Sequence, residues 1–337
     1  MKLVVFGPFK RLGGLLKDGS IVDLNLAYGS YLKDEGKPRP KAQVDSELPA
    51  NLQDFIEAGA TALKAAAKAL AYAEKKRGDL TIKSDGVKIW APLPNPGTMI
   101  SNAGANFADH SAGSSAAREG RKATSEDVKN VIQAVKDGKH PMWGFWKLPR
   151  FVIGPDEPMI YPSRTTHLDY EGEVAVIISK KGKNITADKA MDYVIGYTCY
   201  NDWSVRDDVR TPLERWAFGK NFDTSCSLGP CIVTKDEIPD PYNLNIQLRV
   251  NGELRQNGST SMMLRKFPEW IAHVSRNLTI NPGDIFASGT CAGTAMDTSP
   301  RDVQGKVPTD RFLKVGDIVE LKVEGIGSIK NKVTVER

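Results

Sequence analysis

The alternation of apolar and polar positions separates a mixed N-terminal part of the chain from a longer, strand-rich part. Lys2–Phe6 is typical of a β-strand, and residues 20–24 are predicted to pair with it after a turn at Asp18-Gly19. Residues 52–77 carry apolar side chains at three- and four-residue steps in an alanine-rich background. This spacing predicts an amphipathic helix, so the first part of the chain is expected to hold a small β element and a helix.

A turn-rich segment marks the end of this first part. Prolines, an asparagine and a glycine cluster between Pro92 and Gly97, and such clusters interrupt both helices and strands. We therefore predict a smaller N-terminal domain of residues 1–92 and a main domain of residues 93–337.

Strand-like segments dominate the predicted main domain. They are residues 174–178, 193–200, 231–234, 245–250, 284–287, 318–323 and 332–335, with a turn at Asn251-Gly252. Residues 98–101 are expected to add a short strand, and residues 261–278 have helical character. Because strands and helices do not alternate regularly, the pattern favours a β-rich α+β fold over a doubly wound sheet.

One segment of the main domain departs from this strand-rich pattern. Residues 124–138 are predicted to form a helix with an N-cap. The remainder of residues 110–150 is rich in Ser, Gly, Lys and Trp, and we expect it to be irregular. A long irregular segment in a compact domain is often a lid or binding loop. The aromatic residues at 143–146 fit such a lid or, more plainly, a core or dimer contact.

Composition narrows the classes of function. With 40% hydrophobic and 26% charged residues, a chain of 337 residues can bury a sizeable core. The 46 basic and 41 acidic residues are interspersed, so no nucleic-acid partner is expected, and mild basicity fits small anionic ligands. No apolar run approaches the roughly 18 residues of a membrane span. Four cysteines without CxxC spacing favour reduced thiols and a cytoplasmic setting.

Three carboxylates lie beside predicted strands. Glu171 and Glu173 flank Gly172 ahead of the apolar run 174–178, so on a strand their side chains point to the same face. Asp202 follows the run 193–200. Oxygen donors without nearby histidine or cysteine suit Mg²⁺, Mn²⁺ or Ca²⁺ better than Zn²⁺. Solvated carboxylates at strand edges are the plain alternative.

These carboxylates belong to a series of motifs that closely resembles the signature of the fumarylacetoacetate hydrolase family. The motifs, in the family's order, are Asp169-Tyr170-Glu171-Gly172-Glu173-Val174-Ala175-Val176-Ile177, Asn201-Asp202-Trp203-Ser204-Val205-Arg206-Asp207, Gly219-Lys220-Asn221-Phe222, Asn251-Gly252-Glu253, Pro282-Gly283-Asp284-Ile285, Ser288-Gly289-Thr290 and Gly325-Ile326-Gly327-Ser328. The resemblance spans about residues 93 to 337 and implies a mixed β-roll. It also implies Mg²⁺ or Mn²⁺, with Ca²⁺ as an alternative, ligated by Glu171, Glu173 and Asp202.

The resemblance assigns roles to four further side chains. His110, within Asn106-Phe107-Ala108-Asp109-His110, matches a histidine that acts as general base, and Lys220 matches the family's active-site lysine. Arg206 and Thr290 match substrate-binding positions. Without the resemblance, His110 is a structural histidine, Lys220 a surface lysine, Arg206 an ion-pair partner and Thr290 a turn residue.

Two departures from the family pattern concern the partner of the general base and a fourth metal ligand. Many short members carry a glutamate three residues after the histidine, where this chain has Gly113. Longer members use an aspartate ligand seven residues before the histidine, where this chain has Ala103. Glu119 or Glu126 is the candidate substitute partner for His110. The departures leave the water-activation step open.

The resemblance implies a hydrolase that cleaves a carbon–carbon bond in a small 2,4-dioxo acid, such as an acylpyruvate. His110 would activate water, and Lys220 would stabilise the leaving enolate. Tautomerisation, decarboxylation or hydration of an oxo-acid uses the same enolate stabilisation without hydrolysis, and Gly113 mildly favours these alternatives. A non-catalytic metal- or ligand-binding protein is a third reading, disfavoured because a structural site needs no base. The expected partner is a small oxo-acid, bound by a homodimer.

Overall fold

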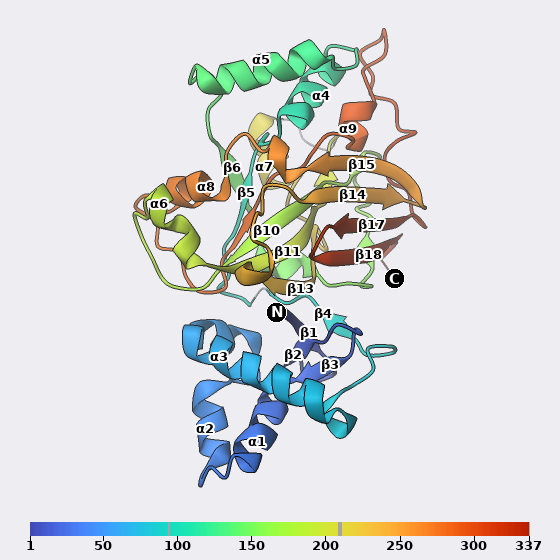
Figure 1. Ribbon diagram of the computed structural model, residues 1–337. Coiled ribbons are helices and arrows are strands. Elements are labelled where there is room, and N and C mark those ends of the chain that lie inside the picture. Colours follow the sequence, from blue (N-terminus) through green and yellow to red (C-terminus); the bar gives the residue numbers. More distant parts are fainter. Residues whose placement is uncertain (94, 208–210, 337) are drawn as a thin grey trace.

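The computed structural model describes residues 1–93, 95–207 and 211–336 (Figure 1). Strands gather in its centre, with helices below them, above them and at one side in Figure 1. Pro94, within the predicted boundary segment, lies outside the described residues. Within the described ranges, no helix combines the length and apolar character needed to cross a bilayer.

The N-terminal part is a three-stranded ribbon followed by helices. Strands β1 (Lys2–Phe6), β2 (Arg11–Leu15) and β3 (Ile21–Asp23) pair in that order, and α1 (Leu24–Asp34), α2 (Pro40–Glu47) and α3 (Leu52–Lys76) follow. The predicted strand and helix are confirmed, with a break in α3 at Gly59. The predicted direct pairing of residues 20–24 with β1 is wrong, because β2 lies between them. Gly13 allows this close packing, since a Cβ there would lie 2.9 Å from Ile21 and Phe6.

The ribbon joins the main sheet directly. The large sheet has the order β3-β2-β1-β13-β11-β10-β16-β5-β6, with β4 beside β1 and β7 beside β13. Its further strands are β4 (Ile89–Trp90), β5 (Ile100–Ala103), β6 (Gly144–Lys147), β7 (Val152–Ile153), β10 (Gly172–Ile178), β11 (Val194–Asp202), β13 (Cys226–Thr234) and β16 (Ile285–Ala287). Lys2 of β1 pairs with Val233 of β13. The division at residue 93 stays a prediction.

Two smaller sheets complete the β-structure. The order β15-β14-β17-β18-β8 joins Glu253–Ser259, Asn245–Val250, Ile318–Val323, Gly327–Thr334 and Met159–Ile160, and β9 (Leu168–Asp169) pairs with β12 (Ser204–Val205). Most pairs are antiparallel, but β16 with β5, β13 with β7 and β18 with β8 are parallel. The predicted β-rich α+β fold with mixed sheets is therefore confirmed.

Strand β10 is buried on both faces. Val174 and Val176 belong to one hydrophobic cluster, while Ala175 and Ile177 belong to a second cluster shared with helices α1 to α3. Burial on both faces explains the uninterrupted apolar run in the sequence. The run directly follows the acidic residues at the start of the strand.

The helix predicted at residues 124–138 is confirmed, but the expectation that the rest of residues 110–150 is irregular is wrong at helix α4 (Ala108–Arg118) and strand β6. Helix α4 precedes α5 (Ser125–Lys136), and α5 has the predicted N-cap, Thr124. Helix α4 escaped the pattern because its buried face consists of small residues, among them Ala112, Gly113 and Ala116. The remaining helices are α6 (Ala187–Ala190), α7 (Pro212–Ala217), α8 (Phe267–Val274) and α9 (Ala295–Thr298).

Candidate active site

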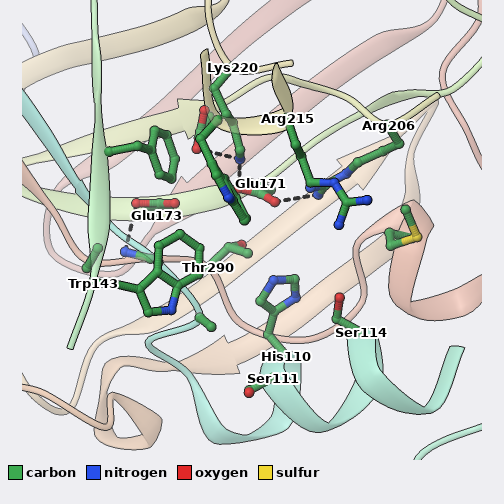
Figure 2. A pocket seen from close by; sticks show the side chains of 18 of the residues that line it. His110, Ser111, Ser114, Trp143, Glu171, Glu173, Arg206, Arg215, Lys220 and Thr290 are labelled. Carbon is green, nitrogen blue, oxygen red and sulfur yellow. Dashed lines mark hydrogen bonds and ion pairs between the residues drawn. The ribbon is translucent and has the colours of Figure 1, made fainter. Parts of the chain in front are cut away.

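Three carboxylates converge where β10 begins and β11 ends. The antiparallel register pairs Gly172 with Asn201, so Glu171 lies beside Asp202, whose amide donates to the Glu171 carbonyl at 2.9 Å. Glu171, Glu173 and Asp202 are all buried, and one carboxylate oxygen of each lies within 4.8 Å of the others. The structure thus brings together the three residues predicted to bind a metal (Figure 2).

Lysine and arginine side chains surround this acidic triad. Lys220 contacts Glu171 Oε2 at 2.6 Å and Asp202 Oδ2 at 2.7 Å. Arg206 bridges Glu171 to Asp169, with 2.8 Å to Asp169 Oδ2. Lys220 is therefore buried among carboxylates and does not lie on the surface.

A second lysine at this site was not anticipated from the sequence. The Lys147 ammonium lies 2.6 Å from Asp202 Oδ1, and both side chains are fully buried. It also donates to the carbonyls of Trp203 and Ser225. Lys147 thus ties the edge strand β6 to the acidic triad.

Positive charge is distributed unevenly over the triad. Burial alone raises the pKa of Glu171, but Lys220, Arg206 and His110 outweigh burial and hold that pKa well below its usual range. Glu173 forms no ion pair with any described residue; its Oε2 accepts from the Gly289 amide at 2.9 Å. Burial and the negative charges of Asp202 and Glu171 raise the pKa of Glu173 well above its usual value.

The residues present fit a divalent cation. Three buried carboxylates supply hard oxygen donors, and Glu173 lacks a cationic partner within the described ranges. Buried carboxylates need a compensating positive charge, and oxygen ligands of this kind suit Mg²⁺, Mn²⁺ or Ca²⁺. The triad can therefore hold a divalent metal ion.

His110 faces the triad from α4, and its carboxylate partner is Asp297 of α9. The His110 Nδ1 and Asp297 Oδ2 atoms are 2.8 Å apart, and Asp297 is buried. Burial opposes protonation of the imidazole, but the charge and hydrogen bond of Asp297, together with the charge of Glu171, outweigh burial and raise the pKa of His110. With Nδ1 engaged, Nε2 is the atom left for proton exchange with a ligand.

In this structure, neither of the suggested partners, Glu119 and Glu126, pairs with His110. Glu119 pairs with Arg121 at 2.9 Å, and Glu126 pairs with Lys129 at 3.6 Å, both on the surface. Gly113 explains how Asp297 replaces them. A Cβ at residue 113 would lie 3.2 Å from the Asp297 Cβ, so the absence of a side chain on α4 makes room for the aspartate.

The placement of Asp297 depends on the strand side of the site. Asp169 accepts hydrogen bonds from the amides of Ala295 at 2.7 Å and Met296 at 3.2 Å, which begin α9. The same Asp169 holds Arg206. One network therefore positions both the guanidinium beside the triad and the carboxylate behind His110.

Thr290 lines the cavity, but its hydroxyl has partners within the protein. It donates to the Gly172 carbonyl at 2.9 Å and accepts from Gln256 Nε2 at 2.8 Å. These bonds tie the loop after β16 to the start of β10. The substrate contact predicted for Thr290 stays a prediction, as does that of Arg206.

These residues enclose one cavity of about 310 Å³. Its lining combines the acidic triad, His110 and Lys220 with aromatic and cationic side chains. Trp143, Phe145 and Trp216 form an aromatic wall, with ring centroids of Trp143 and Trp216 4.4 Å apart. Two further arginines, Arg118 and Arg215, also line the cavity. Figure 2 shows His110 and Arg215 facing the cavity from opposite sides.

Fold and site together define the class of protein: a β-rich α+β chain with a buried acidic site faced by a histidine–aspartate pair. Residues 100–334 match the family model described as fumarylacetoacetate (FAA) hydrolase C-terminal. The chain belongs to the fumarylacetoacetate hydrolase family.

Two relatives are similar along almost the whole chain. The mitochondrial oxaloacetate tautomerase fahd2 of Xenopus laevis is 36% identical over 339 residues, covering 99% of this chain and 90% of the relative. Oxaloacetate tautomerase YisK of Bacillus subtilis is 32% identical over 339 residues, covering 99% of this chain and 100% of YisK. The solved fumarylacetoacetate hydrolase of Exiguobacterium antarcticum superposes with a TM-score of 0.68 at 27% identity, with full coverage of both chains.

Proposed function

We propose that this chain is a divalent-metal-dependent tautomerase that interconverts the enol and keto forms of oxaloacetate or a closely similar 2-oxo dicarboxylate. The observation that carries the proposal is similarity along nearly the whole chain, at 36% and 32% identity, to two proteins named oxaloacetate tautomerases. The alternative reading of the sequence is therefore preferred to its hydrolytic first choice. Glu171, Glu173 and Asp202 would hold the metal, with Mg²⁺ or Mn²⁺ as the expected ion.

The net change in this reaction is the transfer of one proton between C3 and the C2 oxygen of the substrate. In the keto-to-enol direction, a proton leaves C3, the C–H electron pair forms the C2–C3 double bond, and the C2 oxygen gains a proton. No carbon–carbon bond breaks, and no water is consumed. When bound, the cation would supply electrostatic stabilisation of the negative charge that develops on the substrate oxygen.

The chain's own residues supply the proton carrier and further positive charge. His110 Nε2 faces the cavity while Asp297 holds Nδ1 at 2.8 Å, so the imidazole can accept a proton from C3 and return it. Lys220 is kept as an ammonium, because Asp202 and Glu171 raise its pKa against the opposing effect of burial. It therefore adds positive charge beside the forming enolate.

Hydrolysis of a 2,4-dioxo acid is the second candidate, since a histidine–aspartate pair can also activate water. Two assays on the Mg²⁺-loaded protein separate the candidates: decay of the oxaloacetate enol, and cleavage of an acylpyruvate in ¹⁸O-labelled water. We expect the protein to accelerate the decay of the oxaloacetate enol and to release no ¹⁸O-labelled acid from the acylpyruvate. Acylpyruvate cleavage with ¹⁸O in the acid, without any effect on enol decay, would overturn the proposal.

The setting of the protein is also part of the proposal. All four cysteines are buried and unpaired, which supports a reducing compartment such as the cytoplasm. The name of the Xenopus relative places that protein in mitochondria, and the cytoplasmic setting of this chain stays a prediction. The expected homodimer stays a prediction.

A further inference from the structure

Two arginines that line the cavity come from different helices. Arg118 ends α4, the helix that carries His110, and Arg215 lies on α7 beside Trp216. Both line the same cavity as Glu171 and Lys220. The cavity thus has a carboxylate-rich wall on the strands and a cationic lining contributed by the helices.

These two arginines differ from Arg206 in their partners. Arg206 forms ion pairs with Asp169 and Glu171. The Arg118 side chain donates only to Ser114 Oγ, at 3.2 Å, among the residues described. For the Arg215 side chain, the described part of the chain provides no hydrogen bond and no ion pair. A guanidinium carries five N–H donors, so most donors of this pair remain available to a ligand.

Arg118 and Arg215 lie near other cations, and neither forms an ion pair with a residue that the structure describes, although the charge of Asp297 partly offsets the repulsion at Arg118. Partial burial and the positive charges of Arg215, Arg206 and Arg301 lower the pKa of Arg118. Burial and the charges of Arg206 and Arg301 likewise lower the pKa of Arg215. Both remain charged at neutral pH, since an arginine stays protonated in proteins. Converging cations at a cavity attract an anion, and guanidinium groups match the geometry of a carboxylate.

We propose that Arg118 and Arg215 bind the distal carboxylate of the substrate and thereby select 2-oxo dicarboxylates over 2-oxo monocarboxylates. This inference rests on the proposed function, in which the 2-oxo acid end of the substrate lies at the acidic triad. A second carboxylate on the same small molecule then reaches the arginines, and the aromatic wall of Trp143 and Trp216 limits the space between the two ends.

The test compares two stable ligands that differ by one carboxylate. Malate carries the distal carboxylate, and lactate lacks it. Binding of each to the Mg²⁺-loaded protein is measured by isothermal titration calorimetry. We expect the wild type to bind malate more tightly than lactate. Arg118→Gln and Arg215→Gln should each weaken malate binding about tenfold or more, as expected for loss of a charge-assisted hydrogen bond, and leave lactate binding within about twofold.

Arg301→Gln is the matched control. Arg301 contributes positive charge to Arg118 and Arg215 but does not line the cavity. Its loss should weaken malate binding by about twofold or less, since a screened charge at a distance contributes little. The inference fails if the wild type does not bind malate more tightly than lactate, or if Arg118→Gln and Arg215→Gln weaken the binding of both ligands equally. It also fails if Arg301→Gln weakens malate binding as much as these two variants do.

The proposed function and the inference about the arginines can be tested separately. A protein that discriminates malate through both arginines, yet does not accelerate oxaloacetate tautomerisation, would overturn the proposed function and leave this inference standing. If the protein is a tautomerase but Arg118→Gln and Arg215→Gln keep the wild-type preference for malate over lactate, only the inference about the arginines is overturned.

Discussion

The strand side and the helix side of the cavity differ in how their charged side chains are paired and exposed. On the strand side, Glu171, Asp202 and Lys147 are held in a buried network of short ion pairs. On the helix side, Arg118 and Arg215 are more accessible and have few partners among the residues described. Buried charges must be satisfied inside the protein, whereas partly exposed donors remain available to a ligand. The strand side therefore suits a fixed cation, and the helix side suits a changing substrate.

The two sides meet at His110 and Asp297. His110 belongs to α4, but Asp297 is held in place through Asp169, which also fixes Arg206 near the triad. His110 therefore lies on a helix, but its orientation depends on Asp297 and, through Asp169, on the strand side. Changes on the strand side should affect both metal binding and proton transfer, while changes at the arginines should affect substrate selection only.

The largest effect is expected from breaking the metal site. Glu173→Gln removes a charged donor while keeping the shape of the side chain, and exhaustive chelation removes the cation itself. We expect either change to lower tautomerase turnover by about 10³-fold or more, because charge stabilisation at the substrate oxygen is lost. Glu320→Gln, on an exposed strand position, is the control. Full turnover by a protein shown to be metal-free would contradict the assignment.

Substitution of Lys147 tests how much the stability of the fold depends on this buried positive charge beside Asp202. Lys147→Met removes a cation between buried groups, and we expect the free energy of unfolding to fall by about 3 kcal/mol, the lower end for breaking a buried pair, since Lys220 still contacts Asp202. Denaturant titration measures this change. Lys129→Met, which breaks an exposed pair on α5, should change stability by less than about 0.5 kcal/mol. Equal stability of both variants would show that Lys147 is not needed for charge balance.

Asp297 tests the connection between the two sides. The Asp297 charge raises the pKa of His110, so Asp297→Asn should lower that pKa and shift the acid limb of the pH–rate profile to lower pH. The base is active when unprotonated, so wild-type activity rises as pH increases through a pKa above the ordinary 6.5. Turnover at the optimum should fall by about tenfold or more, because the imidazole loses its orienting partner.

A relocated carboxylate separates an orienting role from a purely structural one. Gly113→Glu in the Asp297→Gly background places a carboxylate one helical turn from His110, in the space that the whole Asp297 side chain vacates. Partial recovery of turnover and of the original acid limb is expected. A double variant no better than Asp297→Gly alone, with the fold intact by circular dichroism, would count against an orienting carboxylate.

The sequence predicted the strand side better than the helix side, for physical reasons. Buried strands produce continuous apolar runs such as that of β10, and motif residues next to such runs are placed by strand register. Asp297 lies 187 residues from His110, and nothing local links them. Lys147 lies in a segment expected to be irregular, and burial of a lysine leaves no local signature. Strand β2 was missed because Gly13 and Gly14 break the apolar pattern while permitting close packing.

The central claim is that this chain moves a proton at C3 of oxaloacetate through His110. The most direct test is NMR of deuterium exchange at C3 in D₂O, comparing the Mg²⁺-loaded wild type with His110→Ala and with Mg²⁺ alone. We expect the wild type to exchange one of the two C3 positions selectively, and His110→Ala to lose about 10²-fold or more of that rate while still binding metal. Exchange at an undiminished rate in His110→Ala, or without selectivity in the wild type, would contradict the claim.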